Sequence, residues 1–296
     1  ATKFIIMIKA KIKRFLINNF PNFFKILQII KNDILFNKKK KKFSGWGLET
    51  SLLLPWDDEK IFHNETSKGY IKSKNKLNKK ILNKEFFLGQ IENYKENLSF
   101  EDVLKHFDEL TYRHYVVYYS AITAYHNTRS RNIVECGVAH GMAIFFAINA
   151  FLKDDSYKVY LYDSWESMRG DELKTEKDLL KKGEYDYLDI DATKKNLNEY
   201  FSNIVFNKGY IPDSFKKSKN PDDISWLHID LNSSYATKKA LEFFYEKIEK
   251  NGIILFDDYA HDSYEDTRIV IEEFFKDKKI NFLQLMTGQV IVTKKE

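Results

Sequence analysis

Acidic residues and glycines follow two apolar runs at a spacing that suits the binding of a nucleotide-like ligand. The run Ile133–Val138 contains Glu135 and Gly137, and Gly141 follows it. Asp163 ends a second apolar run, 22 residues after Gly141. In open parallel sheets, ligands bind at the carboxyl ends of the strands, and an acid after the second strand can bind two ribose hydroxyls. Glycines at such a place let the backbone approach the ligand.

The order of the acid and the glycines indicates which ligand. A dinucleotide site has the spacing G-x-G-x-x-G, which brings bare amides to a pyrophosphate. Here the spacing is E-x-G-x-x-x-G, from Glu135 to Gly141. A carboxylate at residue 135 would repel a pyrophosphate, but it suits a ligand with a cationic amino-acid end, such as S-adenosylmethionine. The alternative is a glycine turn in some other α/β protein.

Three further acids follow two later apolar runs. Asp230 closes the run Trp226–Ile229, and Asp257 and Asp258 close the run Ile253–Phe256. If the two runs are neighbouring parallel strands, the three carboxylates converge, and their repulsion raises at least one pKa unless a cation is present. Oxygen ligands suit Mg²⁺, which could hold a diol and lower the pKa of the hydroxyl to be methylated. The alternative is that Asp257 and Asp258 only cap the next segment.

If the ligand is S-adenosylmethionine, the expected reaction is methyl transfer. This reaction requires positioning, a deprotonated acceptor and exclusion of water rather than a covalent intermediate. The candidate bases are Asp230, His261 after the acid pair, and His140 in the glycine turn. His228 lies inside an apolar run, and we expect it to be structural.

These residues require a frame of alternating strands and helices, which is typical of a parallel sheet covered on both faces. Two short β runs joined by Thr287-Gly288 end the chain as an antiparallel hairpin. The expected fold is therefore a doubly wound, Rossmann-like α/β sheet of seven strands, mostly parallel. Strands are expected near 132–136, 158–163, 203–208, 225–230 and 252–257, and helices near 140–152, 191–201, 234–250 and 264–276.

Further helices are expected before the sheet. One begins near Ser99, and another spans about 111–126 and contains the aromatic and basic cluster Tyr112–Tyr115. We favour packing of this cluster against the sheet edge over a catalytic role. The lysine-rich stretch 67–84 is expected to be exposed.

Charge is unevenly distributed along the chain. The 296 residues carry a net charge of +5, whereas residues 1–43 alone carry +11, so the remainder carries −6. This basic, helical N-terminal extension could lie on an anionic membrane surface or pack against the body or a neighbouring subunit. An acidic core argues against nucleic-acid binding. No apolar stretch is long enough to span a membrane, and the start does not resemble a signal peptide. The single cysteine, Cys136, fits a reducing compartment.

With these motifs in order, the chain resembles the class I S-adenosylmethionine-dependent methyltransferases of the macrocin O-methyltransferase (TylF-like) family. The resemblance extends over about residues 100 to 293. The matching pieces are Val134–Val138, Leu161–Glu166, Asn207–Ser214, Leu227–Asp230 and Asp257–Tyr259.

The resemblance implies roles for individual residues. Glu135 and Gly137 would flank the methionine part of the cofactor, Asp163 would bind the ribose, and Gly209 and Tyr210 would line the adenine pocket. The residues expected to bind the cofactor are Glu135, Gly137, Val138, Gly141, Asp163, Ser164, Gly209 and Tyr210. The positions expected to bind Mg²⁺ are Asp230, Asp257 and Asp258, and Asp230 is also a possible general base. His261 is the second expected catalytic residue, because of its position after the acid pair rather than because of the resemblance.

The chain departs from this family pattern in three places. Asn232 stands where many relatives carry a second acid, the stretch Glu166–Ile190 could be a lid or an acceptor-specific insertion, and the basic N-terminus has no counterpart. The expected organisation is an extension at 1–43, a connector and helical cap at 44–110, and a methyltransferase core at 111–296.

We expect a cytoplasmic O-methyltransferase, also peripheral at the inner membrane surface if residues 1–43 bind lipid, that forms homo-oligomers. Its acceptor would be a sugar hydroxyl in a glycan or secondary metabolite. Two alternatives remain at this point: a metal-independent N- or other small-molecule methyltransferase, and a membrane-peripheral binding protein with an inactive methyltransferase core.

Overall fold

The computed structural model describes residues 65–87, 110–171, 173–260 and 263–296. The basic extension expected at 1–43, the helix expected from Ser99 and the candidate base His261 lie outside the described residues. Within these ranges, every helix is too short or too polar to cross a membrane.

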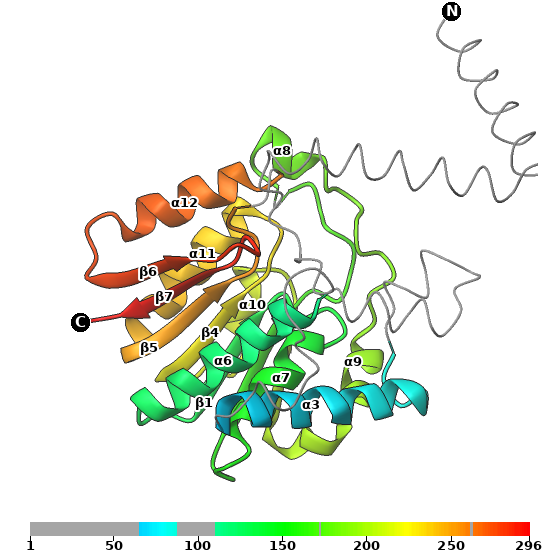
Figure 1. Cartoon of the computed structure of the whole chain (residues 1–296). Coiled ribbons are helices and arrows are strands. Elements are labelled where there is room, and N and C mark those ends of the chain that lie inside the picture. Colours follow the sequence, from blue (N-terminus) through cyan, green and yellow to red (C-terminus); the bar gives the residue numbers. More distant parts are fainter. Residues whose placement is uncertain (1–64, 88–109, 172, 261–262) are drawn as a thin grey trace, which may run out of the picture. The chain divides into compact units, whose positions relative to one another are not determined.

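The described chain forms one seven-stranded sheet in the order β3-β2-β1-β4-β5-β7-β6 (Figure 1). The first five strands are parallel, and β7 runs antiparallel to both β5 and β6. Because β1 lies between β2 and β4, and β5 lies beside β4, the acidic ends of these strands meet at one edge of the sheet. The strands are β1 (Asn132–Cys136), β2 (Lys158–Asp163), β3 (Ile204–Lys208), β4 (Ile224–Ile229), β5 (Ile248–Phe256), β6 (Ile280–Gln284) and β7 (Val290–Lys294).

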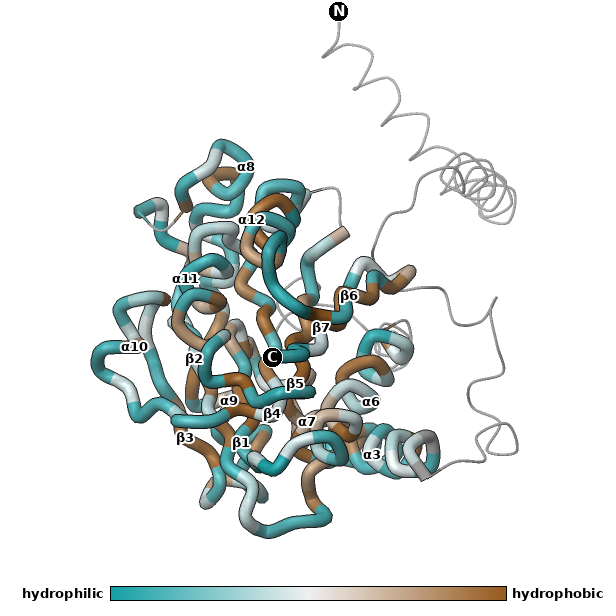
Figure 2. Tube along the Cα trace, turned by 90° about the vertical axis from the view of Figure 1, so that its left-hand side faces the viewer, coloured by the Kyte–Doolittle hydropathy of each residue, from teal (hydrophilic) through white to brown (hydrophobic). Residues whose placement is uncertain are grey.

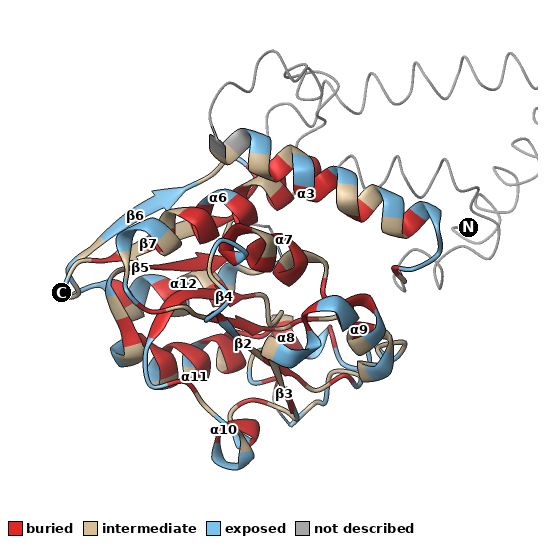
Figure 3. Ribbon diagram, turned by 90° about the horizontal axis from the view of Figure 1, so that it is seen from below, coloured by how far each residue is buried: buried red, intermediate tan, exposed pale blue. Residues whose placement is uncertain are grey.

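Helices cover both faces of the sheet. Figure 3 shows α3, α6 and α7 on one side and α11 on the other. The helices are α3 (Glu65–Leu82), α6 (Thr111–Asn127), α7 (Met142–Phe151), α8 (Glu176–Leu179), α9 (Ile190–Asn196), α10 (Asp213–Lys217), α11 (Ser234–Phe244) and α12 (Glu265–Phe275), and 3-10 turns lie at Asn198–Asn203 and Tyr245–Lys247.

Successive residues of a strand pack alternately into two hydrophobic cores. On β4, Trp226 packs with α3, α6 and α7, whereas Leu227 packs with α10, α11 and α12. Such alternation follows from the two-residue period of a strand, and strands buried on both faces are almost continuously apolar. In Figure 2 the hydrophobic colour accordingly concentrates along the sheet.

The structure confirms the expected α/β fold with its terminal hairpin. Two local expectations were wrong. The stretch 67–84 is not simply exposed, because Tyr70, Leu77 and Ile81 of α3 are buried against α6 and α7. Helix α6 packs over β4 and β5, on the face of the sheet rather than at its edge.

Candidate active site

The loop after β1 is built around Asp163, at the end of β2. Its Oδ2 accepts hydrogen bonds from the backbone amides of Val138 (2.6 Å) and Ala139 (2.9 Å), and its Oδ1 accepts one from the amide of Trp165 (2.7 Å). Burial raises the pKa of this carboxyl. Asp163 therefore shapes the glycine loop itself, a role that the sequence did not suggest. Its contact with a ribose stays a prediction.

Gly137 brings this loop against the end of β4. Its φ is 83°, and a Cβ there would lie 1.7 Å from the carbonyl oxygen of Asp230. The amide of Asp230 in turn donates to the carbonyl oxygen of Cys136 (2.8 Å). Residue 137 must be glycine because the backbone of β4, rather than a ligand, occupies the space of a side chain.

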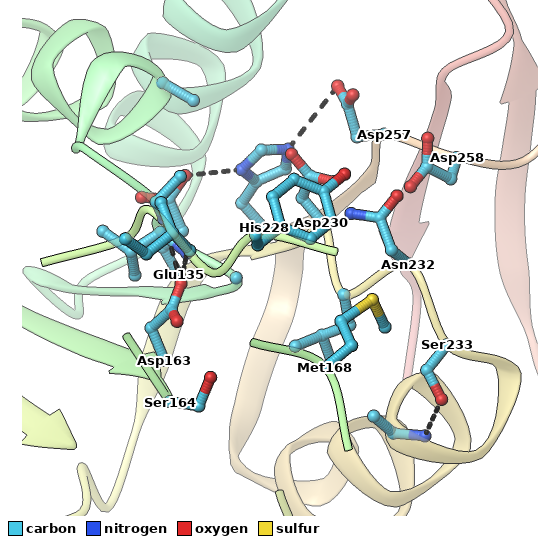
Figure 4. Close-up of a pocket in the computed structure, with 18 of the residues that line it drawn as sticks. Glu135, Asp163, Ser164, Met168, His228, Asp230, Asn232, Ser233, Asp257 and Asp258 are labelled. Carbon is cyan, nitrogen blue, oxygen red and sulfur yellow. Dashed lines mark hydrogen bonds and ion pairs between the residues drawn. The ribbon is translucent and has the colours of Figure 1, made fainter. Parts of the chain in front are cut away.

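A buried charged pair connects the ends of β1 and β4. Nδ1 of His228 lies 2.7 Å from Oε1 of Glu135, and its Nε2 lies 3.9 Å from Oδ1 of Asp257 (Figure 4). Burial lowers the pKa of His228, but the carboxylates of Asp257 and Glu135 outweigh it and raise the pKa to about 10. The imidazole is thus protonated between two acids. Burial raises the pKa of Glu135, whose Oε2 has no hydrogen-bond partner among the described residues.

The three expected acids converge at the ends of β4 and β5. Asp230, Asp257 and Asp258 each place one carboxylate oxygen within 4.8 Å of those of the other two. Burial and the neighbouring carboxylates raise the pKa values of Asp230 and Asp258. Oδ2 of Asp258 is buried and finds no hydrogen-bond partner in the described part of the chain. The two carboxyls therefore resist carrying negative charge side by side, and a cation bound between them would favour their ionised forms.

Asp257 differs from its two neighbours because cations already hold it. Arg113, from α6, forms an ion pair with Oδ2 of Asp257, and Nε2 of Gln289 donates to Oδ1 (2.8 Å). Burial would raise the pKa of Asp257, but Arg113 and His228 outweigh it and hold the pKa well below its usual range.

The segment between β2 and α9 (residues 166–171 and 173–189) lies over the acid cluster and is called the roof below. Asp178, which is 1% exposed, accepts hydrogen bonds from the amide (3.0 Å) and hydroxyl (2.6 Å) of Ser234 at the start of α11. Nζ of Lys181 donates to the carbonyl oxygen of Asn232 (2.9 Å) and lies 3.8 Å from the ring centroid of Tyr264. The roof is thus tied to the loop that carries Asp230.

Tyr210 contacts the N-terminal end of this segment. Its hydroxyl donates to the carbonyl oxygen of Ser167 (2.7 Å), and the guanidinium of Arg169 lies 3.8 Å from its ring centroid. Lys208 and Glu166 form an ion pair next to it (3.2 Å). Tyr210, Arg169 and Glu166 line the cavity on the side of β3.

One cavity of about 310 Å³ reaches from the glycine loop and Tyr210 to the acid cluster. Every expected site residue within the described ranges lines it except Gly141. Gly141 has a φ of 84° and immediately precedes α7. His140 lines it too, stacked near Tyr187. The cavity walls recovered from the sequence are Glu135, Gly137, Val138, Asp163, Ser164, Gly209, Tyr210, Asp230, Asp257 and Asp258.

Several residues of the cavity carry no recognisable signal in the sequence. Arg113 lay in the aromatic and basic cluster of α6, but nothing in its spacing pointed to Asp257. Gln289 and Tyr264 had no motif at all. Tyr185 belongs to the proposed lid segment, and it lines the cavity with a positive φ of 65°. Such backbone strain in a non-glycine residue is concentrated at functional sites.

Comparisons with known proteins agree with this architecture. The model of the family described as Macrocin-O-methyltransferase (TylF) matches residues 121–287. The solved structure of the O-methyltransferase NovP is similar to this chain with a TM-score of 0.53 and 18% identity, over 62% of this chain and 80% of NovP. The calicheamicin methyltransferase CalS11 gives a TM-score of 0.49 and 13% identity, over 75% of this chain and 91% of CalS11. No curated protein sequence matches.

The sheet order, with a ligand cavity at the carboxyl ends of its parallel strands, defines an α/β methyltransferase fold. The family match covers more than half of the chain. The protein therefore belongs to the macrocin-O-methyltransferase (TylF) family, and it is an S-adenosylmethionine-dependent O-methyltransferase.

Proposed function

We propose that this enzyme methylates a sugar hydroxyl, in a glycan or a secondary metabolite, with help from a divalent cation such as Mg²⁺. The observation that carries the proposal is the convergence of the carboxyl groups of Asp230, Asp257 and Asp258 in the same cavity as Glu135 and the glycine loop. Methyl donor and acceptor can then meet across the end of β4.

The cofactor is proposed to lie along the ends of β1, β2 and β3. Oε2 of Glu135, which is buried and has no hydrogen-bond partner among the residues that the structure describes, suits the ammonium group of the methionine part of the cofactor. The ribose would lie near Asp163 and Ser164. The adenine would lie near Gly209 and the ring of Tyr210, against which the guanidinium of Arg169 packs.

The acid cluster fits a hard divalent cation. Its donors are oxygen atoms only, which Mg²⁺ prefers, and the orphaned Oδ2 of Asp258 needs a partner. Asp230, Asp257 and Asp258 would hold the ion. When bound, such an ion lowers the pKa of a coordinated hydroxyl.

The chain itself contributes orientation, dryness and a proton acceptor. The loop around Gly137 and the cluster around Asp230 are fixed to each other, so donor and acceptor can be held in line. The roof tied down by Asp178 keeps water out. Asp230, whose pKa lies above its usual range, is the proposed acceptor of the hydroxyl proton.

The acceptor side of the cavity favours a polyhydroxyl ring. Tyr185 and Tyr264 offer aromatic faces, and Asn232 offers an amide whose Oδ1 accepts the hydroxyl hydrogen of Tyr264. Aromatic faces combined with a few fixed polar groups are common in small-molecule sites.

Calorimetric titration of S-adenosylhomocysteine, with Mg²⁺ and with EDTA, tests the cofactor site, and a screen of sugar acceptors with each tests the reaction. We expect cofactor binding in both and methyl transfer to sugars only with Mg²⁺. Activity that survives EDTA would favour a metal-independent small-molecule methyltransferase. Absence of cofactor binding in both would favour the inactive, membrane-peripheral alternative.

We also propose that residues 1–43, with their net charge of +11, bring the enzyme to the anionic inner membrane surface. Co-sedimentation with vesicles containing anionic lipid, compared with neutral vesicles and with a chain lacking residues 1–43, tests this. Equal sedimentation of both chains would contradict it.

A further inference from the structure

Arg113 is a buried cation that lines the cavity and pairs with Asp257. The residue is 6% exposed and comes from α6, eight residues before the family match begins. Its Nη1 donates to the carbonyl oxygen of Thr287 (2.9 Å), and its Nη2 donates to the carbonyl oxygen (3.1 Å) and the carboxylate of Asp257. One side chain thus joins α6, the end of β5 and the β6–β7 turn.

This arrangement gives Asp257 a fixed orientation that its neighbours lack. One of its oxygens faces Arg113 and the other accepts from Gln289. Among the described residues, Oδ2 of the neighbouring Asp258 has no hydrogen-bond partner. Figure 4 shows Asp257 on the side of His228, with Asp258 next to it.

We propose that Arg113 is a positioning residue for the cation site: it holds the Asp257 carboxylate in the orientation in which Asp230, Asp257 and Asp258 can bind one divalent ion. This inference rests on the proposed function. Hydrogen bonds to ligating carboxylates orient them, and their loss typically weakens metal binding about 10- to 100-fold. Lysine is a poor substitute, because one ammonium group cannot reproduce the planar fork that reaches two carbonyls and a carboxylate.

The test measures Mn²⁺ affinity by electron paramagnetic resonance, and S-adenosylhomocysteine affinity by calorimetry, on the full chain. The variants are Arg113→Met, which keeps the apolar stem, and Arg113→Lys, which keeps the charge. Arg131→Met is the matched control, because Arg131 pairs with Asp154 (3.0 Å) away from the cavity.

We expect Arg113→Met to weaken Mn²⁺ binding about tenfold or more, Arg113→Lys to recover part of the loss, and Arg131→Met to change nothing. The affinity for S-adenosylhomocysteine should stay within about threefold in all three. Tighter or unchanged Mn²⁺ binding in Arg113→Met would overturn this inference but not the proposed function. Arg113 would then either compete with the ion for Asp257 or have no effect on its binding. A parallel loss of both ligands would also overturn it, as the signature of general structural damage. Absence of Mn²⁺ binding in the unaltered chain would overturn both this inference and the metal-assisted function.

Discussion

The carbonyl oxygen of Asp230 occupies the space that a side chain on Gly137 would need. The two chain segments approach so closely that a Cβ on residue 137 would come within 1.7 Å of that oxygen. This contact holds the cofactor loop against the acid cluster. A substitution that displaces one of the two should therefore also displace the other.

Gly137→Ala should therefore unfold more easily and lose cofactor binding. The positive φ alone costs about 1–2 kcal/mol, and displacing the β4 backbone adds about 1–3 kcal/mol. Gly183→Ala is the control, because its φ is similar at 85° but nothing lies within 4 Å of its Cβ. Urea denaturation should show a loss of at least about 2 kcal/mol for Gly137→Ala and about 1 kcal/mol for Gly183→Ala. Equal losses would contradict the argument.

Neutralising Asp257 should destabilise the folded protein, whereas neutralising its neighbour Asp258 should stabilise it. Asp257→Asn leaves Arg113 and His228 without their shared carboxylate, and breaking a buried pair costs about 3–5 kcal/mol. Asp258→Asn relieves repulsion and should stabilise the protein by about 1 kcal/mol. Thermal unfolding with EDTA present measures both. Destabilisation of similar size in the two variants would show that the acids play equivalent structural parts.

The roof should loosen when Asp178 is replaced. Asp178→Ala removes the acceptor of two hydrogen bonds from Ser234 and the ion pair with Lys181 (3.6 Å). Trypsin should then cut the unaltered lysines of residues 174–182 several-fold faster, since cleavage follows the population of the opened segment. Asp186→Ala, an exposed change in the same segment, is the control. Identical cleavage rates for both variants would mean that Asp178 does not hold the roof.

His114 should make the folded state sensitive to mild acid. Burial, with the charge of Arg113, lowers its pKa from 6.5 to about 3. Between these values the unfolded chain binds a proton that the folded chain excludes, so stability contributed above pH 6.5 is lost as the pH falls towards 3.

The size of this effect can be isolated with His114→Gln. From pH 7 to pH 5, the unaltered protein should lose about 2 kcal/mol more than the variant. His126→Gln, at an exposed position of the same helix, should show the same pH dependence as the unaltered protein. Urea midpoints at the two pH values provide the comparison, and parallel losses in all three proteins would argue against a buried neutral His114.

Sequence patterns predicted the positions of the strands well because each strand is an apolar run, and several of these runs end in an acid. Asp230 and Asp257 could be paired in advance, since adjacent parallel strands end side by side. Arg113 could not, because a contact across 144 residues leaves no periodic signal. The burial of α3 was missed because lysines conceal the spacing of Leu77 and Ile81, four residues apart on one helical face.

Asp163 illustrates a different limit. The sequence located the residue correctly but could not reveal that its carboxylate is occupied by the amides of Val138 and Ala139. Side-chain partners of this kind depend on loop geometry, which hydrophobic periodicity does not encode.

The position of Arg113 also bears on where the chain may be cut for domain transfer. A fragment limited to residues 121–287 would lose the first half of α6, with this guanidinium, and all of β7, the partner of β5. Asp257 would keep His228 but lose its ion pair with Arg113, and β5 would be left with an open edge. A transplantable catalytic unit must therefore include at least Thr111 to Lys294.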